Sequence, residues 1–417
     1  MHVHRRSQNE NAKPPAIILG GPITGLVAAR SLSRAGVQVT ALGTDGDYFG
    51  YSRCCVKAVS ASKSDLQQQV WLTWLLERAP RGAVVLAGGD EGLELIARER
   101  TALLERGLLP AESNDDAVLA LLDKDKTYEI AHRTGTLTPK AFSVRNVSDI
   151  GPELDTLRYP CGLKALHRHV FERRSPIRDK VIVVRNRDEL ERMLRLMLGL
   201  GLEMQVTEIV EGPDERIVVH TTYLDERGEP LMQFTHRKLR QRPIHFGVGC
   251  YSVGEWLPEV AEAGLRFAQA AGVRGMAVTE FKEDPVDGSL WLFESNPRFD
   301  LSNALVRASG FDLTLLSYER TAGLPQSPMG PVKWGRHLWH PIDDLRSFLD
   351  YRAQGEIDWG TYSRSVLRRQ TFSLFAADDP RPSVVECGRT VRRALRLADR
   401  RLHARPVLSE PRESAFP

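Results

Sequence analysis

The chain has 417 residues, a length that predicts two or three packed units and not one core. Charged residues make up 27% of the composition and hydrophobic residues 42%, which excludes a disordered chain and an ordinary membrane protein. There are 57 basic and 54 acidic residues, so the formal charge is only +3. This balance gives no reason to expect a nucleic acid or an anionic membrane as a partner.

The cysteines and the apolar segments favour a cytoplasmic protein. The chain has five cysteines, an odd number without the C-x₂-C spacing of zinc sites, and we expect them to be reduced packing residues. Residues 1–15 lack the apolar core of a signal peptide, and no later segment has the roughly 18 apolar residues of a membrane span. The cysteines are Cys54, Cys55, Cys161, Cys250 and Cys387.

Residues 14–120 alternate short apolar runs with helical patterns. The predicted strands lie at residues 16–20, 37–42 and 83–87, and the predicted helices at residues 24–35, 65–79 and 91–106. Such alternation predicts a small doubly wound α/β domain.

The pattern changes twice after this domain. A helix that ends at Arg133, extended segments and a charged helix at residues 187–200 predict a small α+β unit over residues 121–201. Strand patterns over residues 202–329 predict an antiparallel sheet with acidic residues on its loops. These patterns lie at residues 204–210, 216–224, 231–239, 275–282 and 290–294. Residues 330–417 form a C-terminal extension that ends in an arginine-rich helix.

The segment Gly20–Gly25 could be mistaken for a dinucleotide-binding fingerprint. Glycine-rich turns between a strand and a helix let a pyrophosphate approach the helix N-terminus. However, Pro22 stands where the fingerprint needs its second glycine, and Asp45 lies beyond the usual ribose-binding position. We interpret the segment as a tight turn, and an NAD- or FAD-dependent oxidoreductase remains the alternative function.

The most informative residues lie around a predicted hairpin. Two strands joined by a turn at Asp287 would bring Glu280 and Glu294 side by side, and alternation puts Asn296 on the same face as Glu294. Two carboxylates and an amide oxygen are ligands that suit Mg²⁺. Arg298, two positions further on that face, could contact phosphoryl oxygens.

This arrangement resembles the ATP-grasp superfamily, in which an acidic residue, a short turn and an E-x-N-P-R stretch end the nucleotide-binding core. The resemblance covers residues 16–324 and implies an ATP-grasp fold of mixed α/β and α+β class. It also implies that residues 14–120 are the Rossmann-like pre-ATP-grasp domain, residues 121–201 the lid and residues 202–329 the catalytic subdomain. The C-terminal extension is similar to that of the carboxylate-amine ligases grouped with D-aspartate ligase.

The same resemblance implies a set of nucleotide-binding residues. Lys126, in an Asp-Lys pair followed by Gly135 and Pro139, would contact phosphate, as would Lys164 at the end of a strand. The hinge near Glu208 would bind the adenine, and Glu215 the ribose. Lys238 would face the triphosphate, although a basic strand of this kind is as commonly a solvated face. The implied set is Lys126, Lys164, Glu208, Ile209, Val210, Glu215 and Lys238.

The chain departs from the family pattern after Lys164. The family usually has a glycine-rich loop over the phosphates at this point, whereas this chain reads Ala165-Leu166-His167-Arg168-His169 and continues with Arg173 and Arg174. Basic side chains would then cover the phosphates, or the activity is altered. The second alternative function is therefore a nucleotide-binding protein without ligase activity.

The resemblance implies an ATP-dependent ligase that joins a carboxylate to an amine through an acyl phosphate. Arg298 and Lys238 are the implied catalytic residues, and Glu280, Glu294 and Asn296 the metal ligands. ATP and two Mg²⁺ ions are the implied cofactors, and Mn²⁺ could substitute for Mg²⁺. The implied substrates are an amino acid, a small peptide or a nucleotide-linked precursor, and a homodimer would suit the architecture.

Overall fold

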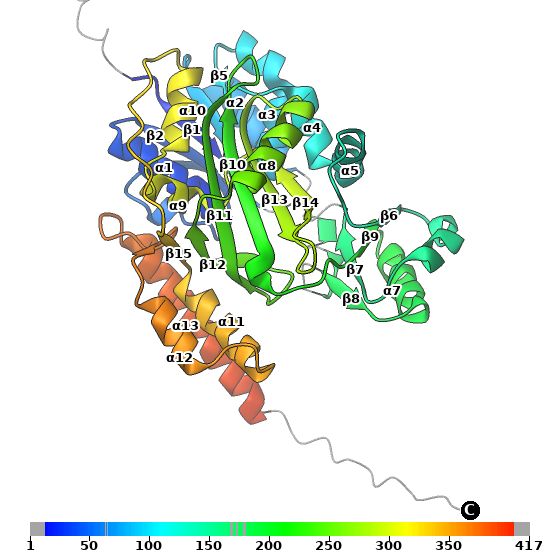
Figure 1. Ribbon diagram of the computed structural model, residues 1–417. Coiled ribbons are helices and arrows are strands. Elements are labelled where there is room, and N and C mark those ends of the chain that lie inside the picture. The colour runs from blue at the N-terminus through cyan, green and yellow to red at the C-terminus, as the bar shows by residue number, and fades with distance from the viewer. Residues whose placement is uncertain are drawn as a thin grey trace, which may run out of the picture.

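The computed structural model describes residues 13–62, 64, 66–166, 170–171, 174–177 and 181–403. Three sheets with their helices form the body of the molecule, and a helical C-terminal extension packs against one end (Figure 1). No helix in this described part is both long and apolar enough to cross a membrane.

The first sheet is parallel, and its strands have the order β3-β2-β1-β4-β5. Side chains alternate along β1, so Ile17 packs with α2 and α3 on one face while Ile18 packs with α1 on the other. The predicted doubly wound domain is confirmed. The strands are β1 (Ala16–Leu19), β2 (Val39–Thr44), β3 (Val56–Ala61), β4 (Val84–Ala87) and β5 (Leu109–Pro110). The helices are α1 (Thr24–Arg34), α2 (Gln67–Arg78) and α3 (Asp90–Glu105). The sequence did not predict β3, because this edge strand is largely exposed and lacks a buried apolar run.

The glycine-rich turn between β1 and α1 is filled by protein atoms. Gly20 and Gly21 have φ values of 65° and 69°, which favour glycine. A Cβ on Gly21 would lie 1.9 Å from the Gly88 oxygen, and one on Gly20 would lie 2.8 Å from the Trp71 ring. These glycines therefore serve the close packing of two turns, which supports the tight-turn interpretation.

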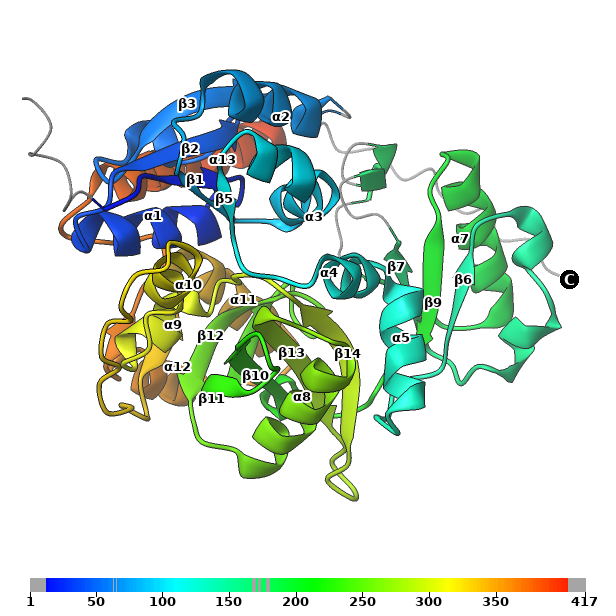
Figure 2. The ribbon, with the colours of Figure 1, turned by 90° about the horizontal axis from the view of Figure 1, so that it is seen from above.

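Two capped helices lead from this domain to the second sheet. Asn114 caps α4 (Asp115–Leu122), and Asp123 caps α5 (Lys124–Arg133) by accepting from the backbone of Asp125 and Lys126. Figure 2 shows α5 beside the second sheet, with α4 between the first domain and the other two parts.

The second sheet, here called the lid sheet, is antiparallel with the order β6-β9-β7-β8. Its core includes Leu190 and Leu194 of α7, which pack on Leu163 and Val206. The elements are β6 (Ala141–Val144), β7 (Cys161–Ala165), β8 (Ile182–Val184), α7 (Arg187–Gly199) and β9 (Met204–Glu208). The predicted strand at residues 204–210 therefore belongs to the lid sheet and not to the antiparallel sheet expected over residues 202–329. Strand patterns do not specify partners, and β9 pairs with β6 and β7, which precede it in the chain.

The third sheet, here called the central sheet, has the order β14-β13-β10-β11-β12-β15-β16. All residues of its inner strand β10 are buried, with Val218 packed in the cluster that contains α8 and Val219 in the cluster that contains α9 and α10. The strands are β10 (Ile217–Leu224), β11 (Pro230–Arg242), β12 (Val248–Gly254), β13 (Gly275–Glu283), β14 (Leu290–Asn296), β15 (His337–Trp339) and β16 (Gln370–Thr371). The helices are α8 (Pro258–Ala270), α9 (Asn303–Ala308) and α10 (Leu313–Thr321).

The C-terminal extension contacts both the central sheet and the first domain. Its strands β15 and β16 extend the central sheet, so the sheet continues past the domain boundary expected at residue 330. Arg240 of β11 donates to Asp344 at 2.6 and 2.9 Å, and Arg30 of α1 donates to Asp379 at 2.9 Å. The helices of the extension are α11 (Pro341–Ala353), α12 (Trp359–Val366) and α13 (Arg381–His403).

The Arg240–Asp344 pair gives a stability prediction, because both side chains are at most 4% exposed. Asp344→Ala would leave Arg240 as an uncompensated buried charge and should cost about 3–5 kcal/mol. The neighbouring Asp343→Ala is the control: its side chain is 53% exposed and should change stability by less than about 1 kcal/mol. Urea unfolding of both variants tests this, and equal midpoints would contradict it.

Candidate active site

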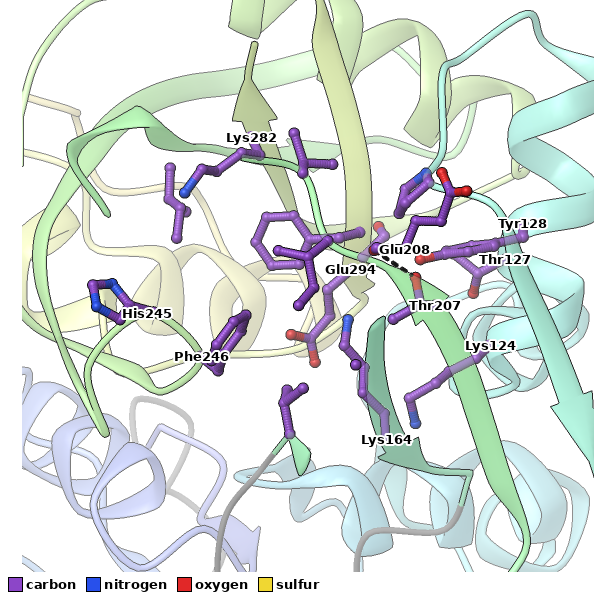
Figure 3. A pocket seen from close by; sticks show the side chains of 18 of the residues that line it. Lys124, Thr127, Tyr128, Lys164, Thr207, Glu208, His245, Phe246, Lys282 and Glu294 are labelled. Atoms are coloured by element: carbon purple, nitrogen blue, oxygen red, sulfur yellow. Dashed lines mark hydrogen bonds between the residues drawn. The ribbon is translucent and has the colours of Figure 1, made fainter. Parts of the chain in front are cut away.

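A cavity of about 370 Å³ lies between the lid sheet and the central sheet. Its walls come from the start of α5, from β7 and β9 of the lid, from β14 and from two connecting segments, residues 209–212 and 245–247. Figure 3 shows Lys124, Lys164 and Glu294 close together in this cavity, with Phe246 on the opposite wall. The lid sheet, the central sheet and α5 therefore each contribute a charged group to one space.

The structure distributes the predicted site residues over the cavity and its surroundings. The predicted residues that line the cavity are Lys164, Glu208, Ile209, Val210, Glu294 and Asn296. The predicted residues outside its lining are Lys126, Glu215, Lys238, Glu280 and Arg298.

The hairpin of β13 and β14 has the register that the sequence predicts. Glu280 pairs directly with Glu294 across the two strands. Glu280 also accepts a hydrogen bond from Lys238 of β11, and both side chains of this ion pair are only 9% exposed. Lys238 therefore compensates the buried charge of Glu280, which places it next to the acidic group behind the cavity wall.

Arg298 joins the hairpin to the first domain. Its guanidinium donates to the carboxylate of Asp90, the first residue of α3, and lies 3.4 Å from the amide oxygen of Asn296. Burial disfavours the charged form of Arg298, but the Asp90 carboxylate outweighs this effect and raises the pKa of the guanidinium. Asp90 and Asn296 both line the cavity, so Arg298 stands directly behind two of its walls.

The lysine that α5 points into the cavity is Lys124 and not Lys126. Lys124 donates to the carbonyl oxygens of Ala165 and Leu166 at 3.0 and 3.2 Å, and it lines the cavity. Lys126 is exposed. Two residues along a helix correspond to a rotation of about 200°, so only one of these lysines can face the lid. A hydrophobic periodicity check over residues 124–133 could have shown this.

The segment that connects the lid to the central sheet forms one wall of the cavity. Glu208 accepts from the backbone and guanidinium of Arg158 at 2.9 and 3.0 Å. Lys282 donates to the Gly212 oxygen at 2.7 Å, and burial lowers the pKa of this ammonium. Glu211 lines the cavity, whereas Glu215 is exposed and contributes its backbone oxygen to Arg237.

His245, which no sequence pattern predicted, lines the cavity beside Phe246. His245 has a φ of 66°, an uncommon value for a residue with a side chain. Its imidazole lies 3.5 Å from Asp214 and 3.1 Å from Glu356 of the C-terminal extension. The hydrogen bond to Asp214 raises the pKa of His245 to about 8. No short motif identifies this residue, because its partners come from two distant segments, Asp214 and residues 351–356.

The residues around Glu294 fit a metal that is shared with phosphate oxygens. Among the described residues, no group of three or more His, Cys, Asp or Glu side chains could hold a metal alone. Glu294 and Asn296 offer a carboxylate and an amide oxygen to the cavity, and Glu280 stands opposite Glu294. These hard oxygen donors suit Mg²⁺, which commonly takes one or two carboxylates together with substrate phosphates.

The predicted phosphate cover follows Lys164 in the chain. His167, Arg168, His169 and Arg173, the predicted phosphate cover, lie outside the described residues. Arg174 is described, and it donates to the Gly201 oxygen at 3.2 Å.

No protein-family model matches the chain. The chain is 25% identical over 285 residues to D-aspartate ligase of Enterococcus faecium, an alignment that covers 66% of this chain and 67% of the ligase. The alignment thus covers about two thirds of each protein.

Several solved structures share the fold. The ADP complex of N5-carboxyaminoimidazole ribonucleotide synthetase aligns with a TM-score of 0.59 and 15% identity, covering 78% of this chain and 81% of that one. L-amino acid ligase from Bacillus licheniformis aligns with a TM-score of 0.56 and 17% identity, covering 75% of each chain. Biotin carboxylase from Campylobacter jejuni aligns with a TM-score of 0.58 and 15% identity, covering 77% of this chain and 74% of that one. At these identities the likeness establishes the fold.

The raised pKa of His245 predicts a pH-dependent stability difference. Protonated His245 stabilises the folded chain fully below its ordinary pKa of about 6.5, and this contribution is lost as the pH rises through about 8. After discounting for solvent screening, wild type should exceed His245→Gln by about 1 kcal/mol more at pH 6 than at pH 9. Denaturant unfolding across this range measures the difference.

His132→Gln is the matched control. His132 is exposed, and its imidazole contacts Thr138 at 2.9 Å without an acidic partner in its hydrogen bonds. The stability difference between wild type and His245→Gln should change more over this pH range than the difference between wild type and His132→Gln. A constant difference between wild type and His245→Gln would refute the role of the Asp214 contact.

Proposed function

We propose that this chain, which has the ATP-grasp fold, is an ATP-dependent ligase that joins a carboxylate to an amine and releases ADP and phosphate. The observation that carries this proposal is the cavity in which two lid-side lysines meet Glu294 and Asn296 of the central sheet. Cations and oxygen ligands facing each other across one space suit a triphosphate that is shared with a metal.

The nucleotide would bind along the connecting segment. Backbone groups of Glu208, Ile209 and Val210 would meet the adenine edge, and the apolar rings of Phe246 and Phe293 line the same cavity. Glu211 replaces Glu215 as our candidate for the ribose hydroxyls, because it lines the cavity and Glu215 does not. A mostly apolar pocket with a few polar groups is typical of small-molecule sites.

The phosphates would bind at the lid end of the cavity. Lys164 and Lys124 project there from β7 and α5 (Figure 3), and both would offset triphosphate charge. Lys124 replaces Lys126 in this role because it faces the cavity. Glu294 and Asn296, with Glu280 behind them, would hold Mg²⁺ or Mn²⁺, and the metal would neutralise charge that develops on the phosphates. We propose that two such ions bind at Glu280, Glu294 and Asn296.

The reaction would proceed in two steps. A carboxylate oxygen of the first substrate attacks the γ-phosphorus, the bond to ADP breaks and an acyl phosphate forms. The amine of the second substrate then attacks the acyl carbon, loses a proton and expels phosphate. Arg298 would stabilise the oxyanion of the tetrahedral intermediate that forms when the amine attacks the acyl carbon. Lys238 would keep Glu280 oriented.

Lid closure would protect the acyl phosphate from water. The lid sheet carries Lys164 and meets the central sheet through the segment of residues 209–212, so rotation about this segment would change the distance between Lys164 and Glu294. Hydrogen exchange in this segment should slow when ATP binds.

The substrate class comes from the relatives. Two of the proteins compared are named for amino-acid substrates, D-aspartate ligase and L-amino acid ligase. We therefore propose an amino acid as one substrate and an amino acid, a small peptide or a nucleotide-linked precursor as the other. The turn at Gly20 and Gly21 is filled by Trp71 and Gly88, which disfavours the dinucleotide-dependent oxidoreductase. A nucleotide-binding protein without ligase activity is the remaining alternative, since the phosphate cover lacks the usual glycines.

The function can be tested by the release of ADP and phosphate across a panel of amino acids, dipeptides and nucleotide-linked peptides, with Mg²⁺ present. Release should require both a carboxylate and an amine. Glu294→Gln should reduce the rate about 10²- to 10³-fold, because it removes a charged oxygen that faces the phosphates. Glu129→Gln, an exposed change on α5, should leave the rate within about twofold of wild type.

Two outcomes would count against the proposal. ATP binding without ADP release for any substrate pair would favour the nucleotide-binding alternative. A Glu294→Gln variant with the wild-type rate would show that the chemistry takes place elsewhere.

The choice between Lys124 and Lys126 gives a separate prediction. Lys124→Ala should weaken ATP binding at least about tenfold, which is the loss of one charge-assisted contact of roughly 1.4 kcal/mol. Lys126→Ala should change the affinity by less than about twofold, since its side chain is exposed. Calorimetric titration with ATP and Mg²⁺ measures both, and a larger effect for Lys126 would reverse the assignment.

A further inference from the structure

A second pocket, of about 160 Å³, lies outside the cavity described above. It is formed where α1 of the first domain, α9 of the catalytic subdomain and residues 371–378 of the extension meet. Figure 1 shows α1 and α9 side by side, and the two helices are in contact. None of its lining residues lines the first cavity.

Three arginines line this second pocket, and two of them have acidic partners. Arg30 is 3% exposed, and it donates to Asp379 and to the carbonyl oxygens of Ser373 and Leu374. Arg34 makes a two-pronged contact with Asp378 at 2.7 and 2.8 Å. These contacts fix two guanidinium groups firmly at the pocket wall.

The third arginine, Arg307, is half-buried, and within the described residues its guanidinium makes neither a hydrogen bond nor an ion pair. Burial lowers the pKa of Arg307, and the charge of Arg34 lowers it further. The acidic groups that act on it from a distance already have partners. Asp312 accepts from Ser31 and from the backbone of Leu315, and Asp378 is held by Arg34.

A half-buried cation without its own counter-ion is costly, and the neighbouring arginines add repulsion. An anion in the pocket would remove this cost. The remaining walls include apolar residues such as Ala304 and Phe372, the hydroxyl residues Thr371 and Ser373, and Asp378, whose carboxylate is held by Arg34. A volume of about 160 Å³ admits a phosphate or a carboxylate group with a short substituent.

We propose that this second pocket binds a small oxyanion, a phosphate or a carboxylate group, through Arg307 with Arg34 and Arg30 beside it. The occupant would link three parts of the chain, because Arg307 belongs to α9, Arg30 and Arg34 to α1, and residues 371–378 to the extension. Binding would therefore stabilise the attachment of the extension to the body of the molecule. The proposal does not depend on the ligase function.

The test uses the full-length protein and two substitutions of equal charge change. Arg307→Met removes the unpaired guanidinium and keeps similar volume. Arg266→Met removes a guanidinium that is exposed on α8 and pairs with Glu262 at 3.6 Å. Thermal unfolding is followed with increasing inorganic phosphate and, separately, acetate, at constant ionic strength set with chloride.

Without phosphate or acetate, Arg307→Met should melt at or above the wild-type temperature, because it removes an uncompensated charge. With one of the two anions, wild type and Arg266→Met should rise in melting temperature along a saturating curve, while Arg307→Met should not rise. Calorimetric titration should show an affinity loss of at least about tenfold for Arg307→Met. A response to phosphate, to acetate or to both identifies which oxyanion the pocket takes.

Three results would overturn the proposal. The first is an Arg307→Met variant that melts well below wild type without either anion, which would make Arg307 a structural residue. The second is an equal rise in melting temperature for all three proteins, which would place any anion binding in the first cavity or on the general surface. The third is the absence of a saturating response to either anion in wild type.

Discussion

Charge compensation across the central sheet controls the arrangement of the site. A buried carboxylate or ammonium is stable only with a partner, and Lys238 and Glu280 supply this to each other from β11 and β13. The pair fixes Glu280 opposite Glu294, which turns a second carboxylate toward the cavity. Arg298 and Asp90 repeat the same principle between the hairpin and the first domain. Glu280 and Asp90 are thus each held by a cation from another element.

The C-terminal extension belongs to the structure of the site and is not an appendage. It extends the central sheet through β15 and β16, and it contacts the cavity wall where Glu356 meets His245. It also reaches the first domain, where Asp379 holds Arg30. Residues 371–378 of the extension also line the second pocket. A change in the extension can therefore alter the loop of residues 245–247 and the contact between the extension and the first domain.

Local sequence patterns predicted the parts of the site that lie close together in the chain. The hairpin was readable because alternation and a short turn determine which residues of β13 and β14 share a face, and these residues include Glu294 and Asn296. Lys164, at the end of β7, and the connecting segment near Ile209 were found by resemblance to the ATP-grasp pattern, and both line the cavity. The doubly wound first domain followed from its alternating strand and helix patterns.

The sequence by itself determined the hairpin register and the alternation of strands β1, β2 and β4 with their helices in the first domain, because these depend on neighbouring residues. Only the tertiary structure decided which groups from distant segments meet. It placed β9 in the lid, turned Lys124 instead of Lys126 to the cavity and brought His245 to its wall. Among the described residues, it also left Arg307 without a hydrogen-bond or ion-pair partner beside two paired arginines. Such meetings depend on how sheets and helices pack, and residues remote in the chain carry no local pattern that specifies them.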